Sequence, residues 1–245
     1  MSPQLTGRRV LVTGGTKGTG RAVVLALARA GASVVTCSRH DDEDARSLSA
    51  ELAATGGPHL VLRADVTDPE DTGRLAGACR DRFGALDALV AAVGAIGHVP
   101  FAALPAAQWR RVTDANLTSC FLTIQGALPL LADGSSVVAI GSRAAAAGAA
   151  QRAHYTAAKA ALAGLTRSLA RELGPRGIRV NLLAPAIIEK AETAQLLGAQ
   201  LDRFREQTAL RRLAVPADLA DVALFLVSDQ SRYVSGQTIS VDGGI

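Results

Sequence analysis

Short apolar runs alternate with stretches of helical periodicity along almost the whole chain. The runs are continuous rather than interleaved with polar residues, which is typical of parallel strands that are buried on both faces. This alternation predicts an α/β fold, in which helices cover both faces of a parallel sheet. We expect strands at Arg8–Thr13, Ser33–Ser38, His59–Arg63, Asp87–Val93, Ser135–Gly141, Ile178–Ala184 and Gln237–Val241. We expect helices near Gly18–Ala30, Asp42–Ala54, Pro69–Phe83, Ala106–Leu131 (which could be broken), Ala153–Leu173 and Pro216–Val227.

The length and apolar content favour one large domain over residues 1–245. A chain of 245 residues with 49% apolar residues can bury a full core. No repeat or linker divides it. The segment Ala186–Leu213 is amphipathic and charged, and it is inserted between a strand and the next core helix. We expect it, at about 186–213, to be a lid over a substrate site.

Charge and cysteine usage exclude several classes of protein. The net charge is only +4, without a block of like charges, which argues against nucleic-acid binding. No apolar run reaches about 18 residues, which argues against a membrane span. Cys37, Cys79 and Cys120 are odd in number and lack metal-ligand spacing. We therefore expect a reduced, cytoplasmic protein with no metal site.

A glycine-rich turn joins the first expected strand to the first expected helix. In TGGTKGTG the glycines allow a tight turn and a close approach to a pyrophosphate, which the helix N-terminus would also attract. The alternative is a plain connection without a ligand. We expect cofactor contacts from Gly14, Thr16, Lys17, Gly18, Thr19 and Gly20.

The end of the second strand distinguishes between the two nicotinamide dinucleotides. An acidic residue there binds the ribose 2′-hydroxyl of NAD, whereas an arginine accepts the 2′-phosphate of NADP. Arg39 follows Ser38 at this position, and Lys17 adds a cation, so we predict NADP(H). Alternatively, Asp41 or Asp42 binds the ribose of NAD. After the third strand, Asp65 and Val66 could reach the adenine, or Asp65 could simply cap a turn.

Three side chains near the middle of the chain predict carbonyl chemistry. Tyr155 and Lys159 are four residues apart, on one face of an expected helix, and Ser142 ends an expected strand. Hydride transfer to a ketone builds charge on its oxygen, which needs a proton donor and a positioned hydrogen bond. We expect Tyr155 to donate the proton, Lys159 to lower its pKa, and Ser142 to hold the oxygen. The alternative for Tyr155 and Lys159 is a surface pair.

These motifs resemble those of the short-chain dehydrogenase/reductase family over essentially all of the chain. The resemblance rests on TGGTKGTG, Asp65-Val66, DANLTSCF, IGS at Ser142, Tyr155-x-x-x-Lys159, IRVNLLAP and VSGQTISVDGG. It implies a doubly wound Rossmann-type sheet of seven parallel strands and a homotetramer or homodimer. It also implies that Asn116 completes a catalytic tetrad through a water held near Lys159. Further cofactor contacts implied by the resemblance are Ala92, Gly94, Tyr155, Lys159, Pro185 and Ile188.

Two motifs depart from the family pattern. Ala91-Ala92-Val93-Gly94 replaces the usual Asn-Asn-Ala-Gly, so the amides that brace the sheet and the cofactor ribose are missing. Pro185-Ala186 replaces Pro-Gly, and Lys190 stands where a cofactor-binding Thr is usual. We expect Lys190 to contact a phosphate or an anionic substrate.

These features together predict an NADPH-dependent reductase of a small-molecule ketone, of the kind found in polyketide or other specialised metabolism. The pocket should be lined by Gly94–Val99, Arg143–Arg152 and Ala186–Leu213. One alternative is a 3-oxoacyl-acyl-carrier-protein reductase of fatty acid synthesis, in which Arg167, Arg171 and Arg176 would offer a basic surface to the carrier. Others are an alcohol dehydrogenase working oxidatively and a non-catalytic dinucleotide-binding regulator.

Overall fold

A computed structural model describes residues 4–189, 193, 198 and 200–245. The described residues form one seven-stranded sheet, in the order β3-β2-β1-β4-β5-β6-β7. Every neighbouring pair of strands is parallel, so the predicted fold class is confirmed. The strands are β1 (Arg9–Thr13), β2 (Ser33–Ser38), β3 (Leu60–Arg63), β4 (Leu86–Ala91), β5 (Leu131–Ile140), β6 (Arg179–Pro185) and β7 (Thr238–Val241).

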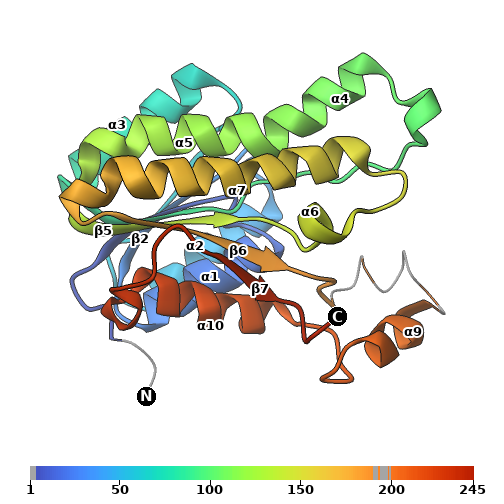
Figure 1. Ribbon diagram of the computed structural model, residues 1–245. Coiled ribbons are helices and arrows are strands. Elements are labelled where there is room, and N and C mark those ends of the chain that lie inside the picture. The colour runs from blue at the N-terminus through green and yellow to red at the C-terminus, as the bar shows by residue number, and fades with distance from the viewer. Residues whose placement is uncertain (1–3, 190–192, 194–197, 199) are drawn as a thin grey trace.

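Helices cover both faces of the sheet and divide the core into two halves (Figure 1). One half lies between the sheet and α1 (Gly18–Arg29), α2 (Glu43–Ala53) and α10 (Pro216–Val227). The other lies beneath α3 (Pro69–Phe83), α5 (Ser119–Ala127) and α7 (Ala153–Leu173). Strand β6 is buried along its whole length, which suits a strand of a parallel sheet that is covered on both faces.

The expected helix Ala106–Leu131 is broken into several parts. It comprises α4 (Ala106–Thr113), a π-helical turn η2 (Asp114–Thr118), α5, and the 3₁₀ turn η3 (Leu128–Leu130). Strand β5 begins at Leu131, four residues before the expected start at Ser135, because Leu131 pairs with Leu86 ahead of a register shift. The 3₁₀ turn at the end of the helix therefore leads straight into the strand.

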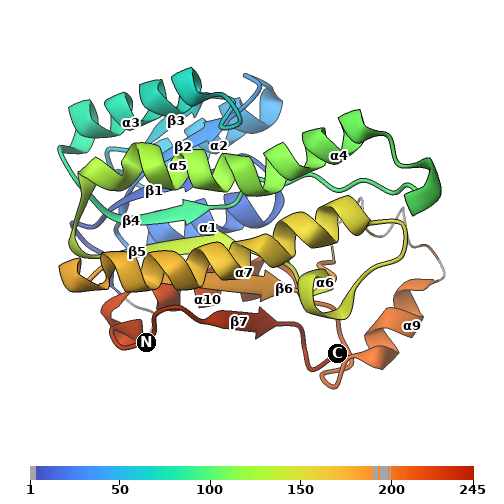
Figure 2. The same ribbon diagram turned by 45° about the horizontal axis from the view of Figure 1, so that its top comes forward.

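The order of the strands places their carboxyl ends along one edge of the sheet. Chain connections run in opposite directions from β1 and β4, which creates the topological switch point where ligands bind in folds of this class. Two short helices, α6 (Ala144–Ala147) and α9 (Gln200–Gln207), lie toward this edge (Figure 2). A functional site is therefore expected here, after β1, β2, β4 and β5.

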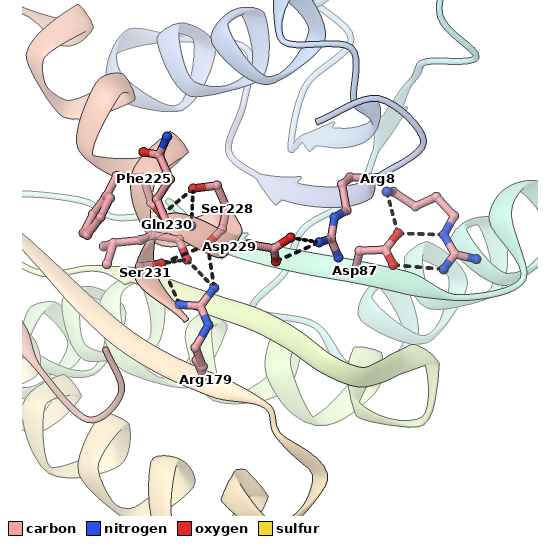
Figure 3. Close-up of polar contacts among 10 residues, drawn as sticks. Arg8, Asp87, Arg179, Phe225, Ser228, Asp229, Gln230 and Ser231 are labelled. Atoms are coloured by element: carbon pink, nitrogen blue, oxygen red, sulfur yellow. Dashed lines mark hydrogen bonds and ion pairs between the residues drawn. The ribbon is translucent and has the colours of Figure 1, made fainter. Parts of the chain in front are cut away.

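Arginine side chains fix the opposite edge of the sheet (Figure 3). Buried Arg179 donates to Ser231 Oγ (2.8 Å) and to the carbonyls of Leu226 (2.9 Å) and Ser228 (3.2 Å). Its guanidinium thus satisfies carbonyl groups at the C-terminal end of α10, where helix carbonyls have no intrahelical partner. Arg8 pairs with Asp229 (2.7 Å), and the Arg9 guanidinium pairs with Asp87 (2.8 Å).

Candidate active site

The glycine-rich turn connects β1 to α1 with no room for side chains at its closest point. A Cβ atom added to Gly20 would lie 2.1 Å from the Gly14 carbonyl oxygen. Helix α1 begins at Gly18 without a side-chain cap and without an acidic residue in its first turn. Its first amide groups and the positive end of its dipole therefore remain available to an anion. This cradle suits the pyrophosphate of a dinucleotide.

Lys17 has acidic partners that sequence reasoning did not anticipate. Its Nζ lies 2.9 Å from Asp42 Oδ2 and 2.8 Å from Asp44 Oδ2, and the hydrogen bonds to Asp44 and Asp42 raise its pKa. Arg39 is exposed at the end of β2, and its Nε donates to His40 Nε2 (3.2 Å). Both expected cations therefore flank the cradle, but Lys17 is already paired. The acidic run after β2 was visible in the sequence, but the sequence did not show that its side chains point toward Lys17.

The other expected adenosine contacts are divided between the surface and the core. Ser38 ends β2, and its Oγ accepts a weak hydrogen bond from the His40 amide (3.4 Å). Asp65 Oδ1 accepts hydrogen bonds from Thr67 N (3.0 Å) and Thr67 Oγ1 (2.7 Å). Asp65 therefore caps a turn, as the second of the two interpretations of this residue expected. Val66 is 3% exposed and packs in the core.

Tyr155 and Lys159 lie on α7, as predicted, but both side chains are buried rather than at the surface. Lys159 Nζ is 6.0 Å from the centroid of the Tyr155 ring. It donates to the carbonyl of Ile140 (2.7 Å), the last residue of β5. Ser142 follows two residues later and interacts with the Tyr155 phenol. The structure therefore brings all three predicted side chains together at the carboxyl end of β5.

Burial is the largest influence on the pKa values of Tyr155 and Lys159. It raises the pKa of the Tyr155 phenol, while Ser142 and the charge of Arg152 act in the opposite direction. Burial also lowers the pKa of Lys159 to about 8, against a smaller opposing effect of Cys120. We expected Lys159 to lower the pKa of Tyr155, but burial raises that pKa, and the effects that oppose burial come from Ser142 and Arg152. The Lys159 ammonium is directed to the Ile140 carbonyl.

Asn116 lies in the π-helical turn η2 and faces Lys159. Its Nδ2 donates to the carbonyls of Ala95 (2.7 Å) and Val112 (2.8 Å). Its Oδ1 is buried and has no hydrogen-bond partner among the described residues. A Cβ atom added to Gly94 would lie 2.7 Å from Asn116 Oδ1 and 3.2 Å from Lys159 Nζ. An unpaired acceptor and a donor therefore lie close to the same point, as a bound water would require.

The two departures from the family pattern are absorbed by apolar and main-chain contacts. Val93 Cγ2 would lie only 2.9 Å from a Cβ on Gly14, so Val93 packs against the glycine-rich turn. Ala92 packs against the core and Gly94 is exposed. Pro185 O accepts from Arg143 N (2.8 Å), and Ile188 bridges to Ala214. The expectation for Lys190 lies outside the described residues.

His154, directly before Tyr155, is a buried polar residue that the sequence analysis missed. It is fully buried, and neither ring nitrogen has a hydrogen-bond partner among the residues that the structure describes. Its Nε2 would lie 2.6 Å from a Cβ on Gly97, so it packs under the loop that follows β4. Only its position next to Tyr155 could have drawn attention to it.

Within the described ranges, no cluster of three or more His, Cys, Asp or Glu side chains has the geometry to bind a metal ion. None of the described helices has both the length and the apolar character needed to cross a membrane.

Comparison with known proteins places this arrangement in a family. A family model described as enoyl-(acyl carrier protein) reductase matches residues 14–245. The chain is 36% identical to an L-rhamnose 1-dehydrogenase (NAD(P)(+)) of Azotobacter vinelandii, over 98% of this chain and 97% of the relative. It is 34% identical to a 3-oxoacyl-[acyl-carrier-protein] reductase of Staphylococcus aureus, over 97% and 98% of the two chains.

Solved structures agree with this placement. A Brucella melitensis protein described as a short-chain dehydrogenase/reductase (glucose/ribitol dehydrogenase) superposes with a TM-score of 0.94 and 36% identity, covering 100% of this chain and 98% of that one. A blue fluorescent protein from a metagenomic library, in complex with NADPH, gives 0.93 and 32% identity, with 98% coverage of each chain. The fold and the site define a nicotinamide-dinucleotide-dependent oxidoreductase of the Rossmann type. The chain belongs to the short-chain dehydrogenase/reductase family.

Proposed function

We propose that this protein is an NADPH-dependent reductase that converts a ketone into a secondary alcohol. The observation that carries the proposal is the buried group formed by Tyr155, Lys159 and Asn116 at the carboxyl end of β5. Lys159 Nζ and Asn116 Oδ1, which has no hydrogen-bond partner in the described part of the chain, lie close to one point beside Gly94. The arrangement provides a proton donor together with a route by which its proton can be replaced.

The dinucleotide would be held along the carboxyl edge of the sheet. The cradle of Gly14, Thr16, Gly18, Thr19 and Gly20 suits the pyrophosphate, and Lys17, Ser38 and Arg39 would bind the phosphorylated ribose. The remaining contacts would come from Asp65, Val66, Ala92, Gly94, Pro185 and Ile188. When bound, a reduced nicotinamide would supply a hydride to the carbonyl carbon of the substrate.

The residues of the chain would supply the proton and the orientation. Tyr155 would protonate the carbonyl oxygen, and its raised pKa keeps the phenol in the acid form at neutral pH. Ser142 would hold the same oxygen through its hydroxyl. Lys159, hydrogen-bonded to Ile140 O, would return a proton toward Tyr155, and Asn116 Oδ1 would position the water that replenishes it.

The substrate is proposed to be a specialised small-molecule ketone rather than a carrier-bound chain. Two of the side chains at the margin of the expected pocket have polar partners, because Arg143 pairs with Asp242 (3.5 Å) and Arg152 donates to His98 (2.5 Å). Arg176 is held by Asp133 (2.9 Å), which removes one cation from the basic surface that a carrier protein would need. These contacts disfavour reduction of carrier-bound fatty acyl groups.

The proposal extends to the organisation of the molecule. It treats residues 1–245 as one domain, with about 186–213 as the lid. Within this segment α9 is tied to Glu189 through Arg205. Trp109 and Phe121, 40% and 43% exposed on α4 and α5, support a homotetramer or homodimer that buries this face. The free thiols of Cys37, Cys79 and Cys120 support the cytoplasm as its location.

The test is oxidation of NADPH and of NADH against β-ketoacyl thioesters, cyclic diketones and aromatic ketones. Turnover with NADPH on one of these classes supports the reductase and identifies the substrate class. Binding of NADPH without turnover on any member would instead favour the non-catalytic regulator.

A second candidate is oxidation of an alcohol with NAD(P)⁺. The pairing of Lys17 with Asp42 and Asp44 favours this candidate, because a neutralised cation binds the 2′-phosphate of NADP(H) less well. A weaker preference for NADP(H), the usual cofactor of reductions, leaves room for oxidation with NAD⁺. A relative at 36% identity carries the name of a sugar dehydrogenase using NAD(P)⁺. Reduction of NAD⁺ by L-rhamnose or related sugars, in the absence of any ketone reduction, would support this candidate.

A further inference from the structure

Lys17 and two carboxylates at the start of α2 form a charge cluster beside the glycine-rich turn. Lys17 Nζ is 2.9 Å from Asp42 Oδ2 and 2.8 Å from Asp44 Oδ2. The Lys17 side chain is 62% exposed, so a ligand at the surface can reach its ammonium. Glu43, between the two aspartates in sequence, is directed elsewhere and pairs with Arg46 (3.3 Å).

The main chain around this cluster is fixed by contacts that do not involve Lys17. Asp42 caps α2, because its Oδ1 accepts from the Ala45 amide (3.1 Å). Arg21 donates to the carbonyl of Thr16 in the glycine-rich turn (3.2 Å) and to the carbonyl of Asp44 (2.9 Å). The two segments are thereby held side by side, which keeps both carboxylates within reach of Lys17.

Any anion that binds Lys17 therefore meets two competitors on the same ammonium. A 2′-phosphate is such an anion, because dinucleotide-binding folds place the adenosine ribose close to the end of β2 and the first βα turn. A ribose 2′-hydroxyl, by contrast, carries no charge and can donate to a carboxylate. The same cluster thus opposes one cofactor without opposing the other.

We propose that Asp44, together with Asp42, sets cofactor selectivity by competing with the 2′-phosphate for Lys17, so that the protein accepts NAD(H) as well as NADP(H). This inference rests on the proposed dinucleotide-dependent function. Asp44 acts as a positioning residue through Lys17. Arg39, which pairs with His40 rather than with a carboxylate, retains the residual preference for the phosphate.

The test is calorimetric binding of four probes to the full chain: NADP⁺, NAD⁺, adenosine 2′,5′-bisphosphate and adenosine 5′-monophosphate. In Asp44→Asn the affinity for the two 2′-phosphorylated probes should rise about two- to fivefold, the range expected for one exposed ion pair. Affinity for NAD⁺ and adenosine 5′-monophosphate should stay unchanged. Asp42→Asn should behave in the same way, because asparagine also caps a helix.

The matched control is Glu43→Gln. It removes the same charge from the same helical turn, but its side chain pairs with Arg46 and not with Lys17. It should leave all four affinities unchanged. An equal gain in Glu43→Gln and Asp44→Asn would overturn the inference, because the effect would then be one of net charge.

A double mutant separates competition for Lys17 from direct repulsion of the phosphate. In a Lys17→Met background, Asp44→Asn should give little or no gain for the 2′-phosphorylated probes. A full gain in that background would overturn the inference while leaving the proposed function intact. If the unaltered protein bound neither NADP⁺ nor NAD⁺, the proposed function itself would fail, and this inference with it.

Discussion

The carboxamide oxygen of Asn116 and the ammonium nitrogen of Lys159 face the same point beside Gly94. A Cβ at Gly94 would lie 2.7 Å from the first and 3.2 Å from the second. The Asn116 oxygen is otherwise unpaired among the described residues, although burying a polar atom without a partner costs free energy. A water between the two groups would remove this cost, which links the stability of the site to its proton supply.

Filling this point should therefore impair turnover. Gly94→Ala places a methyl group against Asn116 Oδ1, and we expect kcat to fall about 10–100-fold as the proton route is blocked. Gly164→Ala on α7 is the control, because a Cβ there meets no atom within 4 Å. The control should keep its activity and gain up to about 1 kcal/mol of stability. Full activity in Gly94→Ala would show that the point is not used.

The pH dependence of activity should reflect Lys159. Burial lowers the pKa of Lys159 to about 8, so the ammonium loses its proton above that pH. We expect kcat/KM for the cofactor to fall above about pH 8, because this parameter reports groups of the free enzyme. The steady-state pH profile measures it. A profile that stays flat up to pH 10 would contradict a role for the Lys159 charge.

The burial of Lys159 should also make the free energy of unfolding depend on pH. An unfolded lysine keeps its proton up to about its ordinary pKa of 10.5. Between pH 8 and 10.5 the unfolded state therefore binds more protons, and the free energy of unfolding should rise with pH. The cost of burying the charge is fully present below pH 8 and amounts to about 3 kcal/mol.

Lys159→Met should remove this cost together with turnover. At pH 7 it should raise the free energy of unfolding by about 1–2 kcal/mol, since the lost hydrogen bond to Ile140 O offsets part of the gain. The gain should shrink as the pH rises above 8 and become a small loss by about pH 10.5, where only the lost hydrogen bond remains. Lys17→Met, at an exposed position, should show no such gain in chemical denaturation. Destabilisation by Lys159→Met at pH 7 would contradict a cost of burying the Lys159 charge.

Arg179 should matter for folding and not for catalysis. Arg179→Met would remove the charged donor shared by the carbonyls of Leu226 and Ser228, which would keep only serine hydroxyl donors. We expect a loss of about 1–3 kcal/mol in the free energy of unfolding. KM should not change below the unfolding transition, because the proposed active site lies at the carboxyl edge of the sheet and Arg179 lies at the opposite edge. Arg167→Met, at an exposed position of α7, serves as the control. A loss no larger than that of the control would refute this account.

The sequence pattern predicted the fold closely where local signals are strong. The helices Pro69–Phe83, Ala153–Leu173 and Pro216–Val227 end at the predicted residues. Pro69 and Pro216 stand in the first turns of their helices, a position that suits proline. Most of the strands were recognisable because they contain consecutive apolar residues, which suits the buried strands of a parallel sheet.

Other features depend on residues far apart in the chain and could not be predicted. The π-helical turn places Asn116 against the carbonyl of Ala95, 21 residues earlier. Whether Lys17 is directed toward a cofactor or toward Asp42 and Asp44 depends on how α2 packs. Arg21 holds the start of α2 through the Asp44 carbonyl. The acidity of Tyr155 depends on the depth of its burial, which i, i+4 spacing does not encode.

The most direct test of the proposed reaction compares the two tyrosines of the chain. Ketone-dependent oxidation of NADPH would be measured for the unaltered protein, Tyr155→Phe and the fully exposed control Tyr233→Phe, with NADPH affinity measured alongside. We predict that Tyr155→Phe loses turnover by about a thousandfold while binding NADPH almost normally, and that Tyr233→Phe matches the unaltered protein. Undiminished turnover in Tyr155→Phe would contradict the assignment of Tyr155 as the proton donor.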